Sequence, residues 1–127
     1  MNNIVLSWSD FGSLVEKLVE KIKKSKEKFD GVYGIPRGGL PLAVILSHKL
    51  NIPLILEPTE NSLITDDISD TGKTLKKTKH KKIAALFSTD WTSMRPDFFI
   101  SMKKSKGDWI VFPWEQDKIN YSCSGST

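Results

Sequence analysis

The sequence predicts an α/β fold: a single domain with a mostly parallel sheet of about five strands, flanked by helices. Two observations predict it. Short apolar segments of the kind that form buried strands alternate with helical segments, and this alternation is typical of parallel strands joined by helical crossovers. The length of 127 residues, 39% of them hydrophobic, suits one compact domain better than two. We expect the domain to span residues 1–117 and a C-terminal tail to follow at 118–127.

The chain begins with a predicted amphipathic helix. Its apolar residues recur at helical spacing and form one face, which comprises Phe11, Leu14, Val15, Leu18, Val19 and Ile22. Ser9 or Asp10 is expected to cap the start of this helix, and the lysines near its end suit the negative end of the helix dipole. A short apolar strand follows at residues 31–35 and leads into a Pro-Arg-Gly-Gly turn at 36–39.

Helix and strand signals continue to alternate over the rest of the chain. Residues 40–50 are apolar on most sides, which predicts a largely buried helix. The remaining predicted strands, all short and apolar, lie at 53–56, 62–65, 83–87, 97–100 and 109–112. A glycine-bearing turn at 70–74 opens a lysine-rich helix that ends near His80. Because ligands of parallel sheets bind beyond the carboxyl ends of the strands, the turns at 36–39 and 70–74 should share one crevice.

Composition excludes several classes of protein. The single cysteine, Cys123, excludes an intrachain disulfide and a Cys-x-x-Cys metal or redox site. The longest apolar run, Leu40–Leu46, has seven residues, far fewer than the ~20 that a membrane-spanning helix needs. The N-terminus shows neither the basic stretch nor the apolar segment of a secretory signal. We therefore expect a cytoplasmic protein without a membrane partner.

The charge is mildly basic, with 19 Lys and Arg against 15 Asp and Glu and a net charge of +4. Lysines cluster at residues 21–28 and around His80. Such clusters are either solvated helix faces or contacts for nucleic acid or another anion. Proteins that recognise bases favour arginine for its bidentate hydrogen bonds, and only Arg37 and Arg95 are arginines. We therefore expect no nucleic-acid partner.

The most informative segment joins two carboxylates to a turn of small residues. Asp66 and Asp67 follow a predicted buried strand, and the turn at 70–74 then opens a helix. Backbone N–H groups, two threonine hydroxyls and the positive end of the helix dipole make this turn suitable for a phosphate. The carboxylates suit sugar hydroxyls or a hydrated magnesium ion.

The residues disfavour two other interpretations of this segment. A capped helix start with surface carboxylates is disfavoured because three aspartates fall within five residues, 66–70, directly after an apolar strand. A nucleotide-binding P-loop requires Gly-x-x-x-x-Gly-Lys-Thr. Residues 72–74 supply the end of that pattern, but Asp67 occupies the position of its first glycine, so the spacing excludes a P-loop.

Residues 63–75 closely resemble the phosphoribosyl diphosphate (PRPP) motif of the type I phosphoribosyltransferases, with Asp-Asp, two residues and Asp-Thr-Gly-Lys-Thr after an apolar strand. Residues 34–40, Gly-Ile-Pro-Arg-Gly-Gly-Leu, resemble the pyrophosphate loop of that family. Residues 109–115 are similar to the C-terminal segment of its xanthine-guanine type and archaeal relatives, and a helix after Trp8 is similar too. The resemblance covers about residues 4–117.

The resemblance implies the type I phosphoribosyltransferase fold and a magnesium-dependent glycosyltransferase of purine salvage. Such an enzyme transfers a 5-phosphoribosyl group from PRPP to a nucleobase, here expected to be a purine, and forms a nucleoside monophosphate and pyrophosphate. PRPP, the nucleobase and pyrophosphate are then its partners, and a homodimer or higher oligomer is expected. The alternative is a non-catalytic sensor of PRPP or a nucleotide on the same fold.

By resemblance, Asp66 and Asp67 face the ribose hydroxyls and hold Mg²⁺, mostly through water. The residues implied to bind the 5′-phosphate are Asp70, Thr71, Gly72, Lys73 and Thr74. Asp70 also matches the carboxylate near the purine N7, the general base of the reaction; from the residues alone it could equally cap the following helix.

The resemblance also implies which residues bind the pyrophosphate and the base. Arg37, Gly38 and Gly39 are implied to hold pyrophosphate, with a cis peptide at Arg37–Gly38. Taken alone, these residues fit a simple tight turn between strand and helix equally well. Trp109 is implied to stack on the purine, and the backbone of Ile110 to contact its C2 substituent. Judged without the resemblance, a Trp beside Ile-Val-Phe is more often a core residue than a base-stacking one.

Two features depart from the family pattern. Thr89 stands where 6-oxopurine transferases carry a lysine that binds the exocyclic oxygen of the purine. The loop 57–62 is short where the family usually has a long loop that closes over the sugar. Because such lids exclude water and complete the site, a short loop predicts slow turnover, cover supplied by a neighbouring subunit, or a binding function without catalysis.

Overall fold

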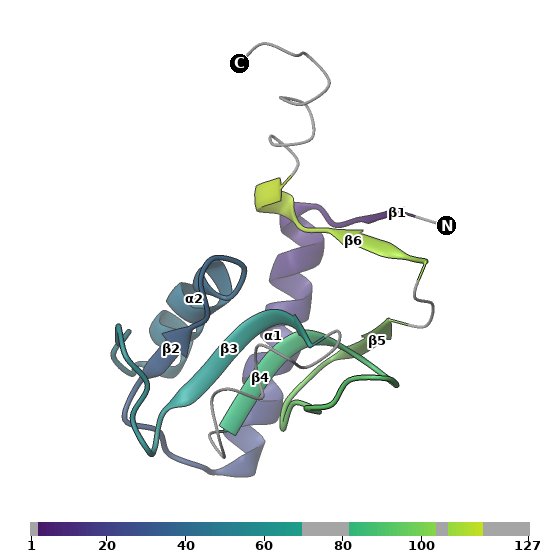
Figure 1. Ribbon diagram of the computed structural model, residues 1–127. Helices are drawn as coiled ribbons and strands as arrows, with labels where there is room; N and C mark the ends of the chain where they lie inside the picture. The colour runs from purple at the N-terminus through teal and green to yellow at the C-terminus, as the bar shows by residue number, and fades with distance from the viewer. Residues whose placement is uncertain (1–2, 70–81, 104–106, 116–127) are drawn as a thin grey trace.

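The computed structural model describes residues 3–69, 82–103 and 107–115. Its main sheet is parallel, with strand order β2-β3-β4-β5 (Figure 1). These strands are β2 (Val32–Gly34), β3 (Leu63–Ser69), β4 (Lys82–Thr89) and β5 (Ser101–Lys103). The predicted α/β class with a mostly parallel sheet is therefore confirmed. The predicted helix that ends near His80 and the predicted domain end at residue 117 lie outside the described residues.

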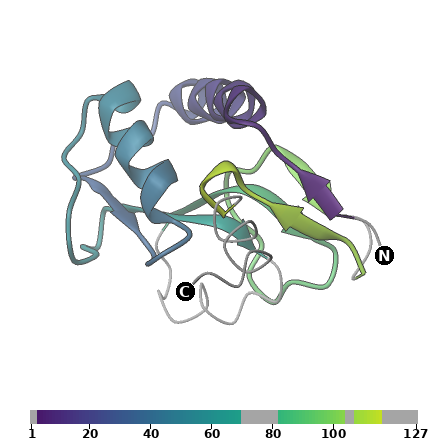
Figure 2. The ribbon, with the colours of Figure 1, turned by 90° about the horizontal axis from the view of Figure 1, so that it is seen from above.

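Two helices, α1 (Trp8–Ser25) and α2 (Leu40–Leu50), cover the same face of the main sheet (Figure 2). The buried side of α1 consists of predicted core positions, namely Phe11, Val15, Leu18, Val19 and Ile22. The N-cap prediction was wrong, because the cap is Ser7. Its hydroxyl accepts a hydrogen bond from the Asp10 backbone N–H at 3.0 Å, and the Asp10 carboxylate accepts one from the Ser7 N–H at 2.9 Å. This reciprocal pair is a capping box.

Strand β3 is longer than predicted and contains the acidic pair instead of ending before it. The register places Asp66 beside Ala85, and Ser69 beside Ser88. Because β4 extends to Thr89, parallel pairing continues past the carboxylates. Asp66 and Asp67 are therefore held by the sheet ladder, and their backbone is fixed by neighbouring strands.

The predicted buried strand at 53–56 is instead an exposed edge. It contributes one parallel bridge, between Leu54 and Val32, and Leu56 is 87% exposed. The Val32 N–H donates to the Pro53 carbonyl at 2.8 Å, and the Ile55 N–H donates to the Val32 carbonyl at 2.9 Å. Among the described residues no strand lies beyond this edge, so its outer side stays uncovered.

The predicted strand at 97–100 also forms only a bridge, between Phe98 and Ala84. A side chain replaces one ladder bond here, since the Ile83 N–H donates to the Asp97 carboxylate at 2.9 Å. Regular pairing with β4 begins at Ser101 and ends with Lys103 beside Thr89. This shift of the fifth strand places Lys103 at its carboxyl end.

A second sheet of two parallel strands was only half predicted. Its strands are β1 (Asn3–Val5), which the sequence did not indicate, and β6 (Trp109–Val111). It stands apart from the main sheet and near the start of α1 (Figure 1). The short helix η1 (Pro113–Glu115) follows β6. The Trp114 ring stacks on Phe112, with centroids 5.0 Å apart, and meets Phe11 of α1 edge-on at 5.2 Å.

These aromatic contacts join the small sheet to the main hydrophobic core. That core includes Phe11 and Leu18 of α1, Leu46 of α2, and Leu86 of β4. Neither of the two described α-helices has the length and apolar character needed to cross a membrane.

Candidate functional site

The Pro-Arg-Gly-Gly turn at 36–39 is fixed against β3. The Ile35 N–H donates to the Thr65 carbonyl at 3.0 Å, and the Gly39 N–H donates to the Ile35 carbonyl at 2.8 Å. The buried Thr65 hydroxyl donates to the Gly39 carbonyl at 3.0 Å. A turn held by these bonds presents a fixed backbone beside the acidic pair.

Two glycines of this turn approach β3 more closely than any side chain would allow. A Cβ atom on Gly38 would lie 2.6 Å from an Asp67 carboxylate oxygen, and one on Gly39 would lie 2.2 Å from the Thr65 carbonyl oxygen. The Gly38 backbone therefore packs directly on the Asp67 carboxylate. Arg37 is exposed at the surface of the same turn. The cis peptide of this turn is Pro36–Arg37, one position before the predicted Arg37–Gly38 bond.

The acidic pair is ordered by its own backbone. The Asp67 N–H donates to the Asp66 carboxylate at 2.9 Å, and the Ile68 N–H donates to the Asp67 carboxylate at 2.8 Å. Burial, reinforced by the hydrogen bond and charge of Asp67, raises the pKa of Asp66 to about 8. Two crowded carboxylates of this kind favour a proton, a cation or hydroxyl donors as partners.

A cavity of about 170 Å³ lies between the end of β3 and the second sheet. Its wall combines residues of both sheets: Asp67, Ile68, Lys103, Trp109, Ile110, Phe112 and Glu115. Trp109 is 63% exposed and Ile110 is buried, so Trp109 is not a core residue. An exposed indole at the mouth of a cavity offers an aromatic face for stacking a flat ligand.

The structure brings together the predicted pyrophosphate turn, the acidic pair and the predicted base-binding residues. The predicted 5′-phosphate residues Asp70, Thr71, Gly72, Lys73 and Thr74 lie outside the described residues. β3 ends at Ser69, immediately before them. The segment 57–62 is a compact turn, in which the Ser62 hydroxyl accepts from the Thr59 N–H at 3.0 Å.

Four residues of the cavity wall were missed from the sequence: Ile68, Lys103, Phe112 and Glu115. The Glu115 carboxylate accepts a hydrogen bond from the Phe112 N–H at 3.0 Å, which fixes the turn after β6. Phe112 was predicted only as part of a strand. The sequence signal for Lys103 was a charged residue three positions after the end of the apolar segment 97–100, near the carboxyl end of a predicted strand.

Within the described ranges, no group of three His, Cys, Asp or Glu side chains could hold a metal ion. Asp66 and Asp67 place two adjacent carboxylates beside the turn at 36–39. That donor set fits Mg²⁺, which typically keeps several waters and binds through one or two carboxylates together with substrate phosphates.

Comparisons with known proteins agree with this geometry, although no family model matches the chain. The chain is 26% identical to xanthine-guanine phosphoribosyltransferase of Idiomarina loihiensis, over 87% of this chain and 85% of the relative. It is 30% identical to the enzyme of that name from Desulfotalea psychrophila, over 72% and 74% of the two chains.

Solved structures show the same relationship. The crystal structure of a purine phosphoribosyltransferase from Pyrococcus horikoshii matches with a TM-score of 0.75 and 34% identity, over 90% of this chain and 94% of that chain. A Helicobacter pylori xanthine-guanine-hypoxanthine phosphoribosyltransferase matches with a TM-score of 0.79 and 21% identity, over 96% and 99% of the two chains. At that identity the second match supports the fold alone.

Proposed function

The chain belongs to the type I phosphoribosyltransferase family, and from this premise we propose that it transfers the 5-phosphoribosyl group of PRPP to a purine base. The bond between ribose C1 and the pyrophosphate oxygen breaks, and a bond forms between C1 and a nitrogen of the base. Pyrophosphate leaves with the electron pair, the base loses a proton, and a nucleoside monophosphate results.

One observation carries this proposal. The turn at 36–39 packs its Gly38 backbone on Asp67, and Asp67 shares a cavity with Trp109. A pyrophosphate-binding turn, carboxylates for sugar hydroxyls and an aromatic face for a base are thus adjacent. That order of binding surfaces matches the order of the groups in the reactants, from pyrophosphate through ribose to purine.

The residues act mainly by positioning, which lowers the barrier because the reacting atoms are held in place. Asp66 and Asp67 orient the ribose through its 2′ and 3′ hydroxyls. Arg37, with the backbone of Gly38 and Gly39, binds the departing pyrophosphate. Trp109 stacks on the purine, and the Ile110 backbone contacts its edge.

The proposal assigns the remaining roles to residues 70–74, on the basis of the sequence. The N–H groups and hydroxyls of this segment bind the 5′-phosphate, and Asp70 accepts the proton of the base. Mg²⁺ fits beside Asp66 and Asp67, held mostly through water, and when bound it offsets the negative charge of pyrophosphate.

The test is a screen of adenine, guanine, hypoxanthine, xanthine and the pyrimidine bases with PRPP and magnesium. We expect pyrophosphate release with at least one purine and none without a base. Pyrophosphate release with pyrimidines alone would contradict the purine assignment.

A second function is favoured by the short loop 57–62, which forms a closed turn and leaves little chain to cover the sugar. On this hypothesis the protein binds PRPP or a nucleotide as a sensor and does not catalyse transfer. Saturable PRPP binding, together with no turnover of any base, would support the sensor. The proposed oligomer and the cytoplasmic location need separate measurements of mass in solution and of cell fractions.

A further inference from the structure

A second, larger cavity, of about 510 Å³, lies between the C-terminal ends of α1 and α2. We call it the helix-end cavity; its apolar wall is made by Ile22, Phe29, Leu50 and Ile52. Ile22 is buried and the other three side chains are half-buried, so this apolar surface is recessed. Small-molecule sites typically have volumes of roughly 300–1,000 Å³ and mostly apolar walls. The size and lining of the helix-end cavity therefore suit a small ligand with an apolar body.

The rest of this wall is charged, and most of the charge is positive. Lys23, Lys26 and Lys28 line the cavity and are exposed. Their side chains form no ion pair with any other residue that the structure describes. Glu27, the acidic member of the described wall, is already bound to Lys82 at 3.3 Å. Three cations at the rim of an apolar cavity complement the charge of an anionic ligand.

The C-terminus of α1 does not cancel this positive charge. The Lys23 carbonyl already accepts a hydrogen bond from the Lys26 N–H at 3.1 Å, and the Ile22 carbonyl accepts one from the Ser25 hydroxyl at 2.6 Å. The negative end of a helix dipole is equivalent to roughly half an elementary charge, whereas the rim carries three lysines. The rim as a whole therefore stays positive.

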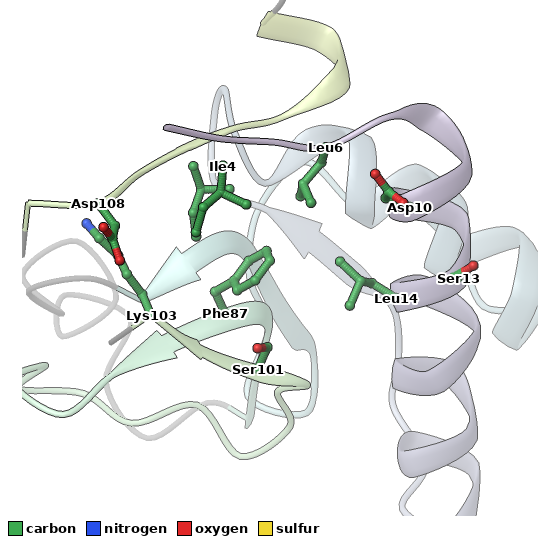
Figure 3. A pocket seen from close by; sticks show the side chains of 10 residues that line it. Ile4, Leu6, Asp10, Ser13, Leu14, Phe87, Ser101, Lys103 and Asp108 are labelled. Carbon is green, nitrogen blue, oxygen red and sulfur yellow. The ribbon is translucent and has the colours of Figure 1, made fainter. Parts of the chain in front are cut away.

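The helix-end cavity is separate from the candidate functional site. Its Glu27 pairs with Lys82, the first residue of β4, whereas the candidate site lies at the carboxyl ends of the strands. A further cavity, of about 470 Å³, lies between α1 and the two sheets (Figure 3). Its wall carries both signs of charge, with Asp10, Lys103 and Asp108. Of these cavities, the helix-end cavity therefore has the charge that favours an anion.

We propose that the helix-end cavity binds a small amphipathic carboxylate, such as a medium-chain fatty acid. The apolar chain fills the cavity, and the carboxylate lies at the rim against Lys23, Lys26 and Lys28. A membrane surface fits this site less well, because helices that lie on membranes insert projecting apolar side chains into the bilayer. Here the apolar side chains are recessed, so the ligand enters the protein. This inference does not depend on the proposed transferase activity.

The test is a titration of the isotope-labelled protein with octanoate, followed by the NMR signals of the backbone amides. We expect saturable shifts at residues 22–29 and 50–52. Octylammonium has the same chain and the opposite charge, so it should bind about tenfold more weakly or worse. Equal affinity for the two probes, shifts confined to residues around the 470 Å³ cavity, or no saturable binding of octanoate would overturn the proposal.

A series of carboxylates tests the apolar part of the site. Burial of one methylene is worth about 0.8 kcal/mol, so affinity should rise up to about fourfold for each methylene from butanoate to octanoate. An affinity that does not change along the series would mean that the carboxylate binds surface lysines without using the cavity. That result would also overturn the proposal.

The charged rim is tested by combining Lys23→Gln with Lys26→Gly. The backbone of Lys26 is left-handed, with φ of 60° at the C-cap of α1, so glycine fits there and the fold is kept. Exposed ion pairs are each worth about 0.2–1 kcal/mol, so losing two should raise the Kd for octanoate by about 2- to 20-fold. An unchanged Kd would exclude the lysines as the anion-binding groups.

The matched control is Lys24→Gln, which removes one charge from the same turn of α1. The Lys24 side chain is 77% exposed and pairs with Glu20 at 3.8 Å, and it does not line the cavity. This variant should leave the Kd for octanoate within about twofold of that of the unchanged protein. A loss of affinity as large as that of the double variant would show that only the overall charge matters, which would contradict a defined site.

Discussion

Gly39 shows how closely the turn at 36–39, the proposed pyrophosphate site, is packed against β3. A methyl group at this position would lie 2.2 Å from the Thr65 carbonyl oxygen, a backbone atom that cannot rotate away. We predict that Gly39→Ala lowers the free energy of unfolding by about 1–3 kcal/mol, the usual cost of overpacking, and weakens pyrophosphate binding. Denaturant titration and pyrophosphate calorimetry measure the two effects.

Gly12 provides the control, because it lies in helix α1 and nothing surrounds the place where its Cβ would be. Gly12→Ala should raise the free energy of unfolding by roughly 0.5–1 kcal/mol and leave pyrophosphate binding unchanged. Equal destabilisation by both substitutions would contradict the special role of Gly39.

The raised pKa of the Asp66 carboxyl leads to a prediction of how the free energy of unfolding changes with pH. Burial raises its pKa from 3.8 to about 8 in the folded protein, so the folded state binds this proton more tightly than the unfolded state. The stability from this group is fully present below pH 3.8 and is lost as the pH rises through 8. Asp66→Asn should remove this loss, so the variant should gain stability relative to the unchanged protein between pH 5 and 9.

Urea titrations of both proteins without ligand, at pH 5 and at pH 9, measure this difference. The relevant quantity is the change in the free energy of unfolding between the two pH values, compared between variant and unchanged protein. An identical pH dependence in the two proteins would show that Asp66 ionises normally.

Asp70 is expected to act on the chemical step. Asp70→Asn keeps the size of the side chain and its ability to cap a helix, but removes the base. Turnover should fall by about 10²–10⁴, with little change in PRPP affinity measured by calorimetry. Unchanged turnover on a base that the unchanged protein uses would exclude Asp70 as the general base.

At the scale of elements, the aromatic contacts of Trp114 connect strand β6, which carries the proposed base-binding residues, to helix α1. Trp114 meets Trp8, Phe11 and Phe112 at centroid distances of 6.3, 5.2 and 5.0 Å. Each such aromatic pair contributes about 0.5–1.5 kcal/mol. Trp114→Ala should therefore substantially weaken the packing of β6 and η1 against α1.

We predict that Trp114→Ala raises the KM for the purine more than the KM for PRPP. The residues proposed to bind PRPP are Asp66 in β3 and the turn at 36–39 that follows β2, both strands of the main sheet, whereas Trp109 belongs to the small sheet. Steady-state kinetics with each substrate varied in turn measures the two constants. Equal changes in both would show that the two sheets do not respond separately.

The sequence predicted elements well where their signal is local. Helix α2 was predicted with the bounds 40–50 that the structure shows, because a long apolar segment lies between a turn and Asn51 at the C-cap. Strand β1 was missed because three residues carry no periodicity. Its pairing with β6 joins positions 3 and 109, a contact that no local pattern records.

The site shows the same division between local motifs and tertiary contacts. Asp66, Asp67 and the turn at 36–39 belong to continuous motifs, so their residue types and spacing were sufficient to find them. Lys103 lines the cavity because β5 begins at Ser101, directly after the predicted strand 97–100, and pairs with the end of β4. Just before β5, the Asp97 carboxylate accepts a hydrogen bond from the Ile83 N–H in place of a backbone carbonyl. This contact between distant residues is a tertiary effect.

At the scale of the whole molecule, an apolar surface near the N-terminus indicates association with another chain. Val5 is 57% exposed and Trp8 60% exposed, and both lie at β1 or the start of α1. Among the strands of the described residues, β1 pairs with β6 alone. An edge strand with exposed apolar side chains tends to associate with another chain.

We therefore predict a homodimer that buries Trp8, with a mass of twice the 14.3 kDa of one chain in light scattering at micromolar concentration. Trp8→Glu places a charge in that surface and should shift the mass toward that of one chain. Val44→Glu is the control, because Val44 is 42% exposed on α2 and outside the proposed contact. A mass of 14.3 kDa for the unchanged protein would exclude the dimer. A dimer that survives Trp8→Glu would place the contact elsewhere, since burying an unpaired carboxylate opposes association.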